Sequence, residues 1–390
     1  MLAPSVVRLA SARALPMAAR NAAQLSSRRG VTGAPSAPPH FQALPVLDYR
    51  TMESDFPQFV ADMRSACCNV GFFVLAGLPP QTVKLHDDVL RVARAFFALP
   101  SEEKSRMDYC HSPQFRGYMQ LGVENTAGRR DEREQIEFGR EEPVPAALTD
   151  APLFTRLRGP NQWPAGPPEF RAIVSQWLQQ MEELSWSVTR ALASSLGLEA
   201  HALDDLFKTP HIQAKLVHYP ATEEALGVEE TASLGVGAHS DSGFLTLLLQ
   251  DDIGGLEVLN GSGQWVAAAP IHGSIVCNLG EVVQLLSGGS FLSTVHRVQR
   301  PPVGRGGRLS APFFWNPSLE AVIHPLSAPP VSSRSEFDAV ASERPRQEAN
   351  CLIPSYGMNA FKSLARSHPE VFARHHPDLR VLPDGQVVLR

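Results

Sequence analysis

The sequence reads GAHSDSGFLTLLLQ at residues 237–250, GSFLSTVHRV at 289–298 and GRLSAPFFWNP at 307–317. Each stretch begins with a glycine and joins β-branched, leucine or aromatic residues to a few polar side chains, a pattern typical of buried strands. Many short strands separated by glycine-rich turns favour a β-sandwich or barrel. We expect strands at residues 216–219, 245–250, 256–259, 264–268, 274–279, 294–298 and 308–315.

Two histidines and an aspartate in these stretches have the spacing of metal ligands. His239 and Asp241 are one residue apart, and side chains at i and i+2 of a strand share a face. His296 lies in V-H-R-V, 55 residues after Asp241, so the fold must bring it to the other two. Two imidazoles and one carboxylate on one face of an octahedral metal leave three positions open, as in non-haem Fe(II) oxygenases. The pattern therefore predicts an Fe(II) site.

A possible anion site follows the third ligand. Arg308 can bind a carboxylate with two parallel hydrogen bonds, and Ser310, two positions on, shares its strand face. The R-x-S triplet occurs once in the chain, whereas H-x-D also occurs at residues 86–88 and 376–378. A bare H-x-D is thus weak, but the ordered set H-x-D, then His, then R-x-S is specific. It predicts an iron centre with an acidic co-substrate beside it.

On these motifs the chain resembles the 2-oxoglutarate/Fe(II)-dependent dioxygenases of the isopenicillin N synthase-like superfamily. The resemblance covers most of the chain, about residues 44–379. It implies a double-stranded β-helix (jelly-roll) core, with Fe(II) as cofactor and 2-oxoglutarate and O2 as co-substrates. It also assigns iron binding to His239, Asp241 and His296, and binding of the 2-oxoglutarate carboxylate to Arg308 and Ser310.

One further co-substrate contact comes from the same resemblance. The family has a tyrosine in a Y-P pair near the co-substrate, and K-L-V-H-Y-P matches it at Tyr219. Many plant members carry an asparagine two residues earlier, where this chain has Val217. The resemblance therefore implies that Tyr219 helps to bind 2-oxoglutarate without that asparagine.

The remaining sequence predicts helices around the strands. Residues 56–67 and 83–97 have the i, i+3, i+4 hydrophobic rhythm, and the longest such pattern, at 170–196, is expected to support the sheet from outside. The fold class expected is mainly β with flanking helices (α+β). The expected regions are 1–40 (transit peptide and linker), 41–150 (N-terminal non-haem dioxygenase region), 151–210 (loop and supporting helix), 211–318 (Fe(II)/2-oxoglutarate jelly-roll core) and 319–390 (C-terminal helical tail).

Substrate contacts are harder to place. The R-G-Y step at Arg116 and Tyr118 resembles a region that approaches the substrate mouth in relatives, although a solvated turn is an equal alternative. Phe244, Phe314 and Trp315 are candidates to line the pocket, with core packing as the alternative. The charged run at residues 128–134 mixes both signs, and we expect it to form a solvated surface face.

Composition limits the class of protein. A net charge of −5 gives no reason to expect nucleic acid, and no apolar run reaches the 18 or so residues of a membrane span. The cysteines are odd in number and form no C-x-x-C, so a disulfide framework is not expected. We expect a small-molecule substrate, no nucleic-acid or membrane partner, and a monomer or weak homo-oligomer.

The N-terminus differs from the rest. Five arginines are spread through Ala, Ser and Leu, and the first acidic residue is Asp48. This composition is typical of an organellar transit peptide, and we predict a mitochondrial protein, with plastid or cytoplasm as alternatives. A disordered extension would be the structural alternative.

These observations predict an enzyme, a non-haem Fe(II)/2-oxoglutarate-dependent dioxygenase that hydroxylates or otherwise oxidises a small molecule with succinate and CO2 as co-products. Two other functions stay open at this stage. One is an iron-dependent oxidase of the same fold that does not use 2-oxoglutarate. The other is a catalytically inactive jelly-roll binding protein.

Overall fold

The computed structural model describes residues 40–126, 129–146, 151–221, 234–326 and 352–390. Residues 37–390 belong to one compact unit. The transit peptide and linker predicted at residues 1–40 lie outside the described residues, apart from His40. Within the described part of the chain, no helix is both long and apolar enough to cross a membrane.

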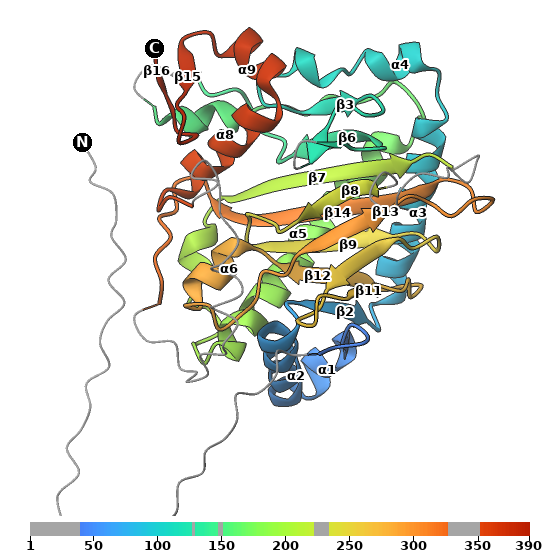
Figure 1. Cartoon of the computed structure of the whole chain (residues 1–390), viewed down its shortest axis with the longest axis vertical. Helices are drawn as coiled ribbons and strands as arrows, with labels where there is room; N and C mark the ends of the chain where they lie inside the picture. Colours follow the sequence, from blue (N-terminus) through green and yellow to red (C-terminus); the bar gives the residue numbers. More distant parts are fainter. Residues whose placement is uncertain (1–39, 127–128, 147–150, 222–233, 327–351) are drawn as a thin grey trace, which may run out of the picture. The chain divides into compact units, whose positions relative to one another are not determined.

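Two sheets form the centre of the unit (Figure 1). In spatial order the larger sheet comprises β1 (Val46–Asp48), β2 (Phe72–Ala76), β12 (Ile275–Leu279), β9 (Leu245–Gln250), β14 (Arg308–Ser318), β7 (Pro210–Tyr219), β6 (Glu134–Gly139) and β3 (Gly117–Met119). The smaller sheet comprises β11 (Trp265–Ala267), β10 (Leu256–Leu259), β13 (His296–Gln299) and β8 (Leu234–His239). The predicted fold, mainly β with flanking helices, is confirmed.

Strand β14 shows how the larger sheet has two different faces. Successive side chains alternate, so Leu309, Ala311 and Phe313 pack in the main core on the helix side. On the other side, Tyr219 of β7 joins Val258 of β10 in a second core between the two sheets. The residues that alternate with the helix-facing set, including Arg308 and Ser310, therefore point toward the space between the sheets.

Helices cover the outer face of the larger sheet. The long predicted helix is α5 (Phe170–Ser195), which contacts β9 and β14 and thus supports the sheet as expected. Its Trp177 is fully buried and meets Phe313 edge to face at 6.1 Å between ring centroids. The other helices that precede the C-terminal tail in the described chain are α1 (Tyr49–Ser54), α2 (Phe56–Asn69), α3 (Pro80–Phe97), α4 (Ser101–Ser105), α6 (Glu281–Leu286) and the 3-10 helices at Tyr109–His111, Leu153–Leu157 and Asp204–Phe207.

The C-terminal tail is only partly helical. Ser355 caps α8 (Tyr356–Ser367) by accepting a hydrogen bond from the Met358 N–H, and α9 (Pro369–His375) follows. Helix α8 contacts β14 and the 3-10 helix at Leu153–Leu157, and α9 contacts the 3-10 helix at Tyr109–His111. After them, β15 (Leu379–Val381) and β16 (Val387–Leu389) form a hairpin that the sequence analysis did not predict. The turn between them contains Pro-Asp-Gly, a recognised hairpin signal.

Candidate metal centre and adjoining cavity

The three predicted metal ligands come together at one end of the smaller sheet. His239 is the last residue of β8 and His296 the first residue of β13, and the two are cross-strand partners. Asp241 lies two residues beyond the end of β8. The sequence argument assumed that the whole H-x-D triplet lies within a strand. In the structure the strand ends at His239, and Asp241 lies outside it. The antiparallel pairing delivers His296 across the 55-residue interval.

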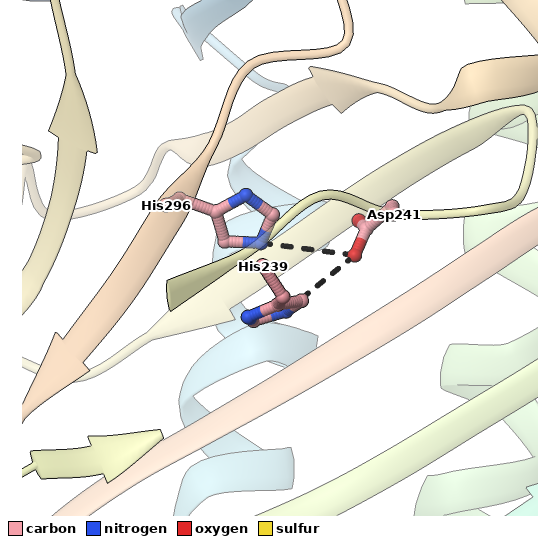
Figure 2. Close-up of side chains that lie close together, drawn as sticks. All are labelled: His239, Asp241 and His296. Atoms are coloured by element: carbon pink, nitrogen blue, oxygen red, sulfur yellow. Dashed lines mark ion pairs between the residues drawn. The ribbon is translucent and has the colours of Figure 1, made fainter. Parts of the chain in front are cut away.

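The three side chains point toward one another (Figure 2). Oδ1 of Asp241 lies 3.7 Å from Nε2 of His239 and 3.7 Å from Nε2 of His296. All three ligand atoms lie within 4.8 Å of one another. Since metal–ligand bonds to nitrogen and oxygen are about 2 Å long, one ion between these atoms can reach all of them.

Hydrogen bonds to the back of each group fix its orientation. Nδ1 of His239 lies 2.8 Å from the carbonyl oxygen of Gly237, and Nδ1 of His296 lies 3.1 Å from that of Thr294. Because a carbonyl can only accept, each Nδ1 carries the proton and each Nε2 keeps its lone pair for a metal. The pair has the donor chemistry of two neutral imidazole ligands.

The aspartate is held in the same way. Oδ2 of Asp241 accepts hydrogen bonds from the hydroxyl of Thr246 at 2.6 Å and the amide of Asn278 at 2.7 Å. This leaves Oδ1 facing the histidines. Thr246 on β9 and Asn278 on β12 are direct neighbours in the larger sheet. The smaller sheet therefore carries the two histidines, and the larger sheet orients the aspartate.

The electrostatics favour the protonation states that a metal needs. The side chain of His239 is 34% exposed and lines the cavity. Burial of its ring, with His296 close by, lowers the pKa of His239 to about 4. Burial raises the pKa of Asp241, but the two imidazoles and the two hydrogen bonds outweigh it and hold the pKa below 3.8. A neutral imidazole and an ionised carboxylate are the metal-binding forms.

The guanidinium of Arg308 is buried and only weakly hydrogen-bonded. Arg308 is 1% exposed, and its guanidinium donates weak hydrogen bonds of 3.3 Å to Ser310 Oγ and 3.3 Å to Gln250 Oε1. Its Nε has no hydrogen-bond partner, and among the described residues Asp251 interacts with the guanidinium electrostatically without a direct hydrogen bond to it. A buried unpaired charge is costly, so this arrangement fits a carboxylate-bearing co-substrate.

Tyr219 adjoins this cation. It is the cross-strand partner of Arg308 between β7 and β14, and the Arg308 Cζ lies 4.8 Å from the centre of its ring. This distance is typical of a cation–π contact, which holds the guanidinium plane in place. Val217 lies beside Ser310 in the same ladder. The predicted set of Arg308, Ser310 and Tyr219 is therefore contiguous.

A cavity of about 330 Å³ opens onto the metal centre. Its walls include His239 and Asp241 from the metal centre, Phe314 and Asn316 from β14, and residues of α8. Five further charged or titratable side chains line it: Glu124, Arg133, Glu137, Lys215 and His368. The sequence analysis named none of these five.

Two of the predicted substrate contacts are structural. Arg116 is 6% exposed and donates to the backbone carbonyls of Arg140, Gly159 and Leu157. Tyr118 is 3% exposed, and its hydroxyl donates to Glu134 at 2.6 Å. Both hold the N-terminal region together, and neither is among the described residues that line the cavity. Their alternative as a solvated turn is equally wrong, because both are buried.

Of the three aromatic residues predicted to line the pocket, one lines the cavity and two lie in the core. Phe314 lines the cavity, as predicted for a pocket residue. Phe244 is 1% exposed and packs edge to face on Phe207, with ring centroids 4.9 Å apart. Trp315 is fully buried, and its indole N–H donates to Thr189 at 3.0 Å. Phe244 and Trp315 are thus core residues on the helix side of the sheet.

The prediction of a solvated surface face at residues 128–134 was wrong for Asp131 and Glu134, whereas Arg130 is exposed and Gly128 lies outside the described residues. Asp131 is 2% exposed, and Glu134 begins β6, a strand that was not predicted. A signal was present in the sequence. Glu137 alternates with apolar residues in E-Q-I-E-F-G, and Lys215 lies four residues before Tyr219, hence on the same strand face.

Family comparisons agree with the geometry. The model described as the non-haem dioxygenase in morphine synthesis N-terminal domain matches residues 44–166, and that of the 2OG-Fe(II) oxygenase superfamily matches residues 212–317. The 2-oxoglutarate-dependent dioxygenase frbJ of Dothideomycetidae sp. is 37% identical over 74% of this chain and 78% of its own. A homoarginine-6-hydroxylase of Arabidopsis thaliana is 32% identical over 69% of this chain and 72% of its own.

A solved structure extends the likeness to the fold. A full-length Neurospora crassa protein in complex with alpha-KG (2-oxoglutarate) and thymine has a TM-score of 0.67 and 27% identity, covering 83% of this chain and 97% of that one. The jelly-roll core is therefore shared with structures that contain 2-oxoglutarate. The chain belongs to the 2-oxoglutarate/Fe(II)-dependent oxygenase superfamily and is a non-haem dioxygenase that uses Fe(II), 2-oxoglutarate and O2.

Proposed function

We propose that His239, Asp241 and His296 hold the Fe(II) of this oxygenase, and that Arg308, Ser310 and Tyr219 hold 2-oxoglutarate beside it. One observation carries the assignment. The space between the two sheets contains three inward-facing metal-ligand atoms within 4.8 Å of one another and also a buried guanidinium whose hydrogen bonds to Ser310 and Gln250 are both 3.3 Å long. A metal dication and a dicarboxylate satisfy both features together.

The protein's own contribution is orientation and exclusion of water. When bound, Fe(II) with 2-oxoglutarate supplies the oxidising chemistry, in which O2 converts the co-substrate to succinate and CO2 and one oxygen atom serves to oxidise the substrate. His239 and His296 present unprotonated Nε2 atoms because backbone carbonyls hold their Nδ1 protons. Arg308 supplies the positive charge for the 2-oxoglutarate carboxylate that lies away from the iron. The Tyr219 ring, against which the guanidinium packs, fixes the orientation of that guanidinium.

The substrate proposed is a small molecule that enters the 330 Å³ cavity. Names among the relatives do not agree on its identity. One is named for homoarginine, one structure contains thymine, and a rice structure at 28% identity and TM-score 0.55 is described as a dioxygenase for auxin oxidation. An amino acid, a pyrimidine and an indole acid share little chemistry, so the substrate depends on the side chains that line this cavity.

An anaerobic titration of the full chain tests the assignment. Fe(II) and then 2-oxoglutarate are added to metal-free protein, and the metal-to-ligand charge-transfer band is followed before O2 is admitted and succinate measured. We expect a band that needs both additions, and succinate afterwards. In Arg308→Ala, iron binding should persist while 2-oxoglutarate affinity falls by about 100-fold, or about 3 kcal/mol, as for a broken buried charge pair. Arg158→Ala, which removes a surface ion pair with Glu320, is the control.

Three results would contradict the proposal or part of it. Iron binding without the band would favour an oxidase that does not use 2-oxoglutarate. Absence of iron binding would favour a jelly-roll binding protein. Unchanged 2-oxoglutarate affinity in Arg308→Ala would remove that residue from the co-substrate site while leaving the iron site intact.

A further inference from the structure

The lining of the cavity also contains a charged cluster made of Glu124, Arg133, Glu137, Lys215 and His368. Four separate parts of the chain contribute to it: the segment before β4 (Asn125–Thr126), strand β6 with the residue before it, strand β7, and the end of α8. All five side chains are at least 85% buried and line the same cavity as the metal ligands. The iron and 2-oxoglutarate sites do not account for them.

The five residues of the cluster include two carboxylates and two cations, and Asp131, which pairs with Arg133, adds a third carboxylate to the network. Glu124 pairs with Arg133 and, at 3.3 Å, with Lys215. Lys215 also contacts Glu137 at 2.6 Å, and Arg133 contacts Asp131 behind the wall at 3.0 Å. Among the described residues of this network, three carboxylates therefore face two cations. Each cation already serves two carboxylates, which leaves neither of them free to receive an anionic substrate group.

The Nε2 atom of His368 is a hydrogen-bond acceptor that faces the carboxylate of Glu124. His368 is 4% exposed, its Nε2 has no hydrogen-bond partner, and that atom lies 3.8 Å from Glu124 Oε1. Its Nδ1 lies 2.7 Å from the hydroxyl of Ser367, which donates its own proton to the Ser363 carbonyl at 2.9 Å. The Ser367 oxygen therefore accepts from Nδ1–H. The Nε2 of His368 is left with a lone pair.

Glu137 completes the set of acceptors. Lys215 and the Gln135 amide both bind its Oε1, the latter at 2.7 Å, so its second oxygen takes neither bond. One atom each of Glu124, Glu137 and His368 lie within 4.8 Å of one another. Converging acceptors beside an excess negative charge are suited to a cation that carries several N–H donors.

We propose that this cluster is the substrate-recognition subsite and that it binds a guanidinium or ammonium group of the substrate. The proposal rests on the proposed function, since it takes the iron at His239, Asp241 and His296 as the reacting centre. Strand β7 carries both Lys215 and Tyr219 on one face, four residues apart, which spans about 13 Å.

The test uses two small probes of nearly the same shape, methylguanidinium and methylurea, which differ in charge. Both are titrated into the full chain with Fe(II) and 2-oxoglutarate but without O2. Saturation-transfer NMR measures binding, and paramagnetic broadening of the methyl signal measures approach to the iron. We expect methylguanidinium to bind at least tenfold more tightly than methylurea, with saturable broadening. Glu137→Gln should reduce that preference to less than twofold.

Glu182→Gln is the matched control, because it makes the same change in an arginine-paired carboxylate outside the cavity lining. It should keep the tenfold preference. Equal binding of the two probes by the unmodified protein would overturn the proposal, as would an undiminished preference in Glu137→Gln. The charge-transfer band in the same sample separates the two ideas: charge preference without the band contradicts the iron assignment alone, and the band without charge preference contradicts this subsite alone.

Discussion

The two ends of the cavity are built in different ways. The metal end takes its ligands from two adjacent strand ends, β8 and β13, and its histidines are direct cross-strand partners. The charged end takes its side chains from four separate parts of the chain, residues 124–368, with no common sequence motif. The metal end uses uncharged imidazoles and a single carboxylate, whereas the charged end packs carboxylates against Arg133 and Lys215.

This difference indicates that the two ends have different functions, one in the chemistry and one in the choice of substrate. The metal end does chemistry that the whole superfamily shares, so a fixed local geometry is sufficient. The charged end is assembled by the tertiary fold, from elements other than the strands that carry the two histidines. Charge and shape at that end can therefore set the substrate, while the metal end stays the same. The following substitutions test how independent the two ends are.

The largest effect is expected from Asp241→Ala. Its carboxylate is the only anionic ligand of the triad, and loss of even a supporting partner of a metal ligand costs up to about 100-fold in affinity. We expect iron affinity to fall by at least about 100-fold and succinate formation to stop, with the fold retained. Iron content after gel filtration measures this. Asp378→Ala, at the same position of the C-terminal H-x-D, should keep its iron.

A smaller effect, on stability, is expected from Glu124→Gln at the charged end. Burial raises the pKa of Glu124, but Arg133 and Lys215 outweigh it and hold the pKa below its ordinary 4.5. The ionised carboxylate therefore stabilises the fold fully above pH 4.5, and this contribution is lost as the pH falls through the lower folded pKa. At pH 7 the variant should lose about 2 kcal/mol of unfolding free energy, as for a hydrogen bond to a charged group.

Urea unfolding between pH 7 and pH 3 measures this change. The difference between Glu124→Gln and the unmodified protein should shrink as the pH falls below 4.5. Iron binding at pH 7 should be unaffected if the two ends are independent. A difference that stays constant over the whole pH range would contradict the ionised state of Glu124, and loss of iron would contradict the independence.

The smallest effect is expected from Tyr118→Phe. The Tyr118 hydroxyl donates to buried Glu134, which also binds Lys104 and His218. Removal of this one bond should cost about 1 kcal/mol of stability. The KM for any substrate and the iron content should stay the same, because Tyr118 does not line the cavity. A raised KM with unchanged stability would restore the substrate contact suggested by the sequence.

The sequence analysis predicted the grouping of side chains where residue spacing was the signal. His239 and Asp241 could be found because a short polar triplet precedes an apolar strand, and Arg308 because R-x-S is unique in the chain. It failed where burial decides the role. Arg116 and Glu137 are buried, although Arg and Glu side chains usually lie at the surface. A pattern of charges in the sequence does not say whether a neighbouring strand or helix covers such a side chain.

By itself, then, the sequence determined the family, the strand-rich core and the identities of the residues placed at the metal end. These depend on local alternation and on side-chain chemistry, which a linear pattern records. Only the tertiary structure decided that the segment before β4, strand β6 and the end of α8 bring Glu124, Glu137 and His368 into one cavity with His239 and Asp241. Contacts between residues more than 200 positions apart arise from the packing of whole sheets and helices, and no local pattern encodes them.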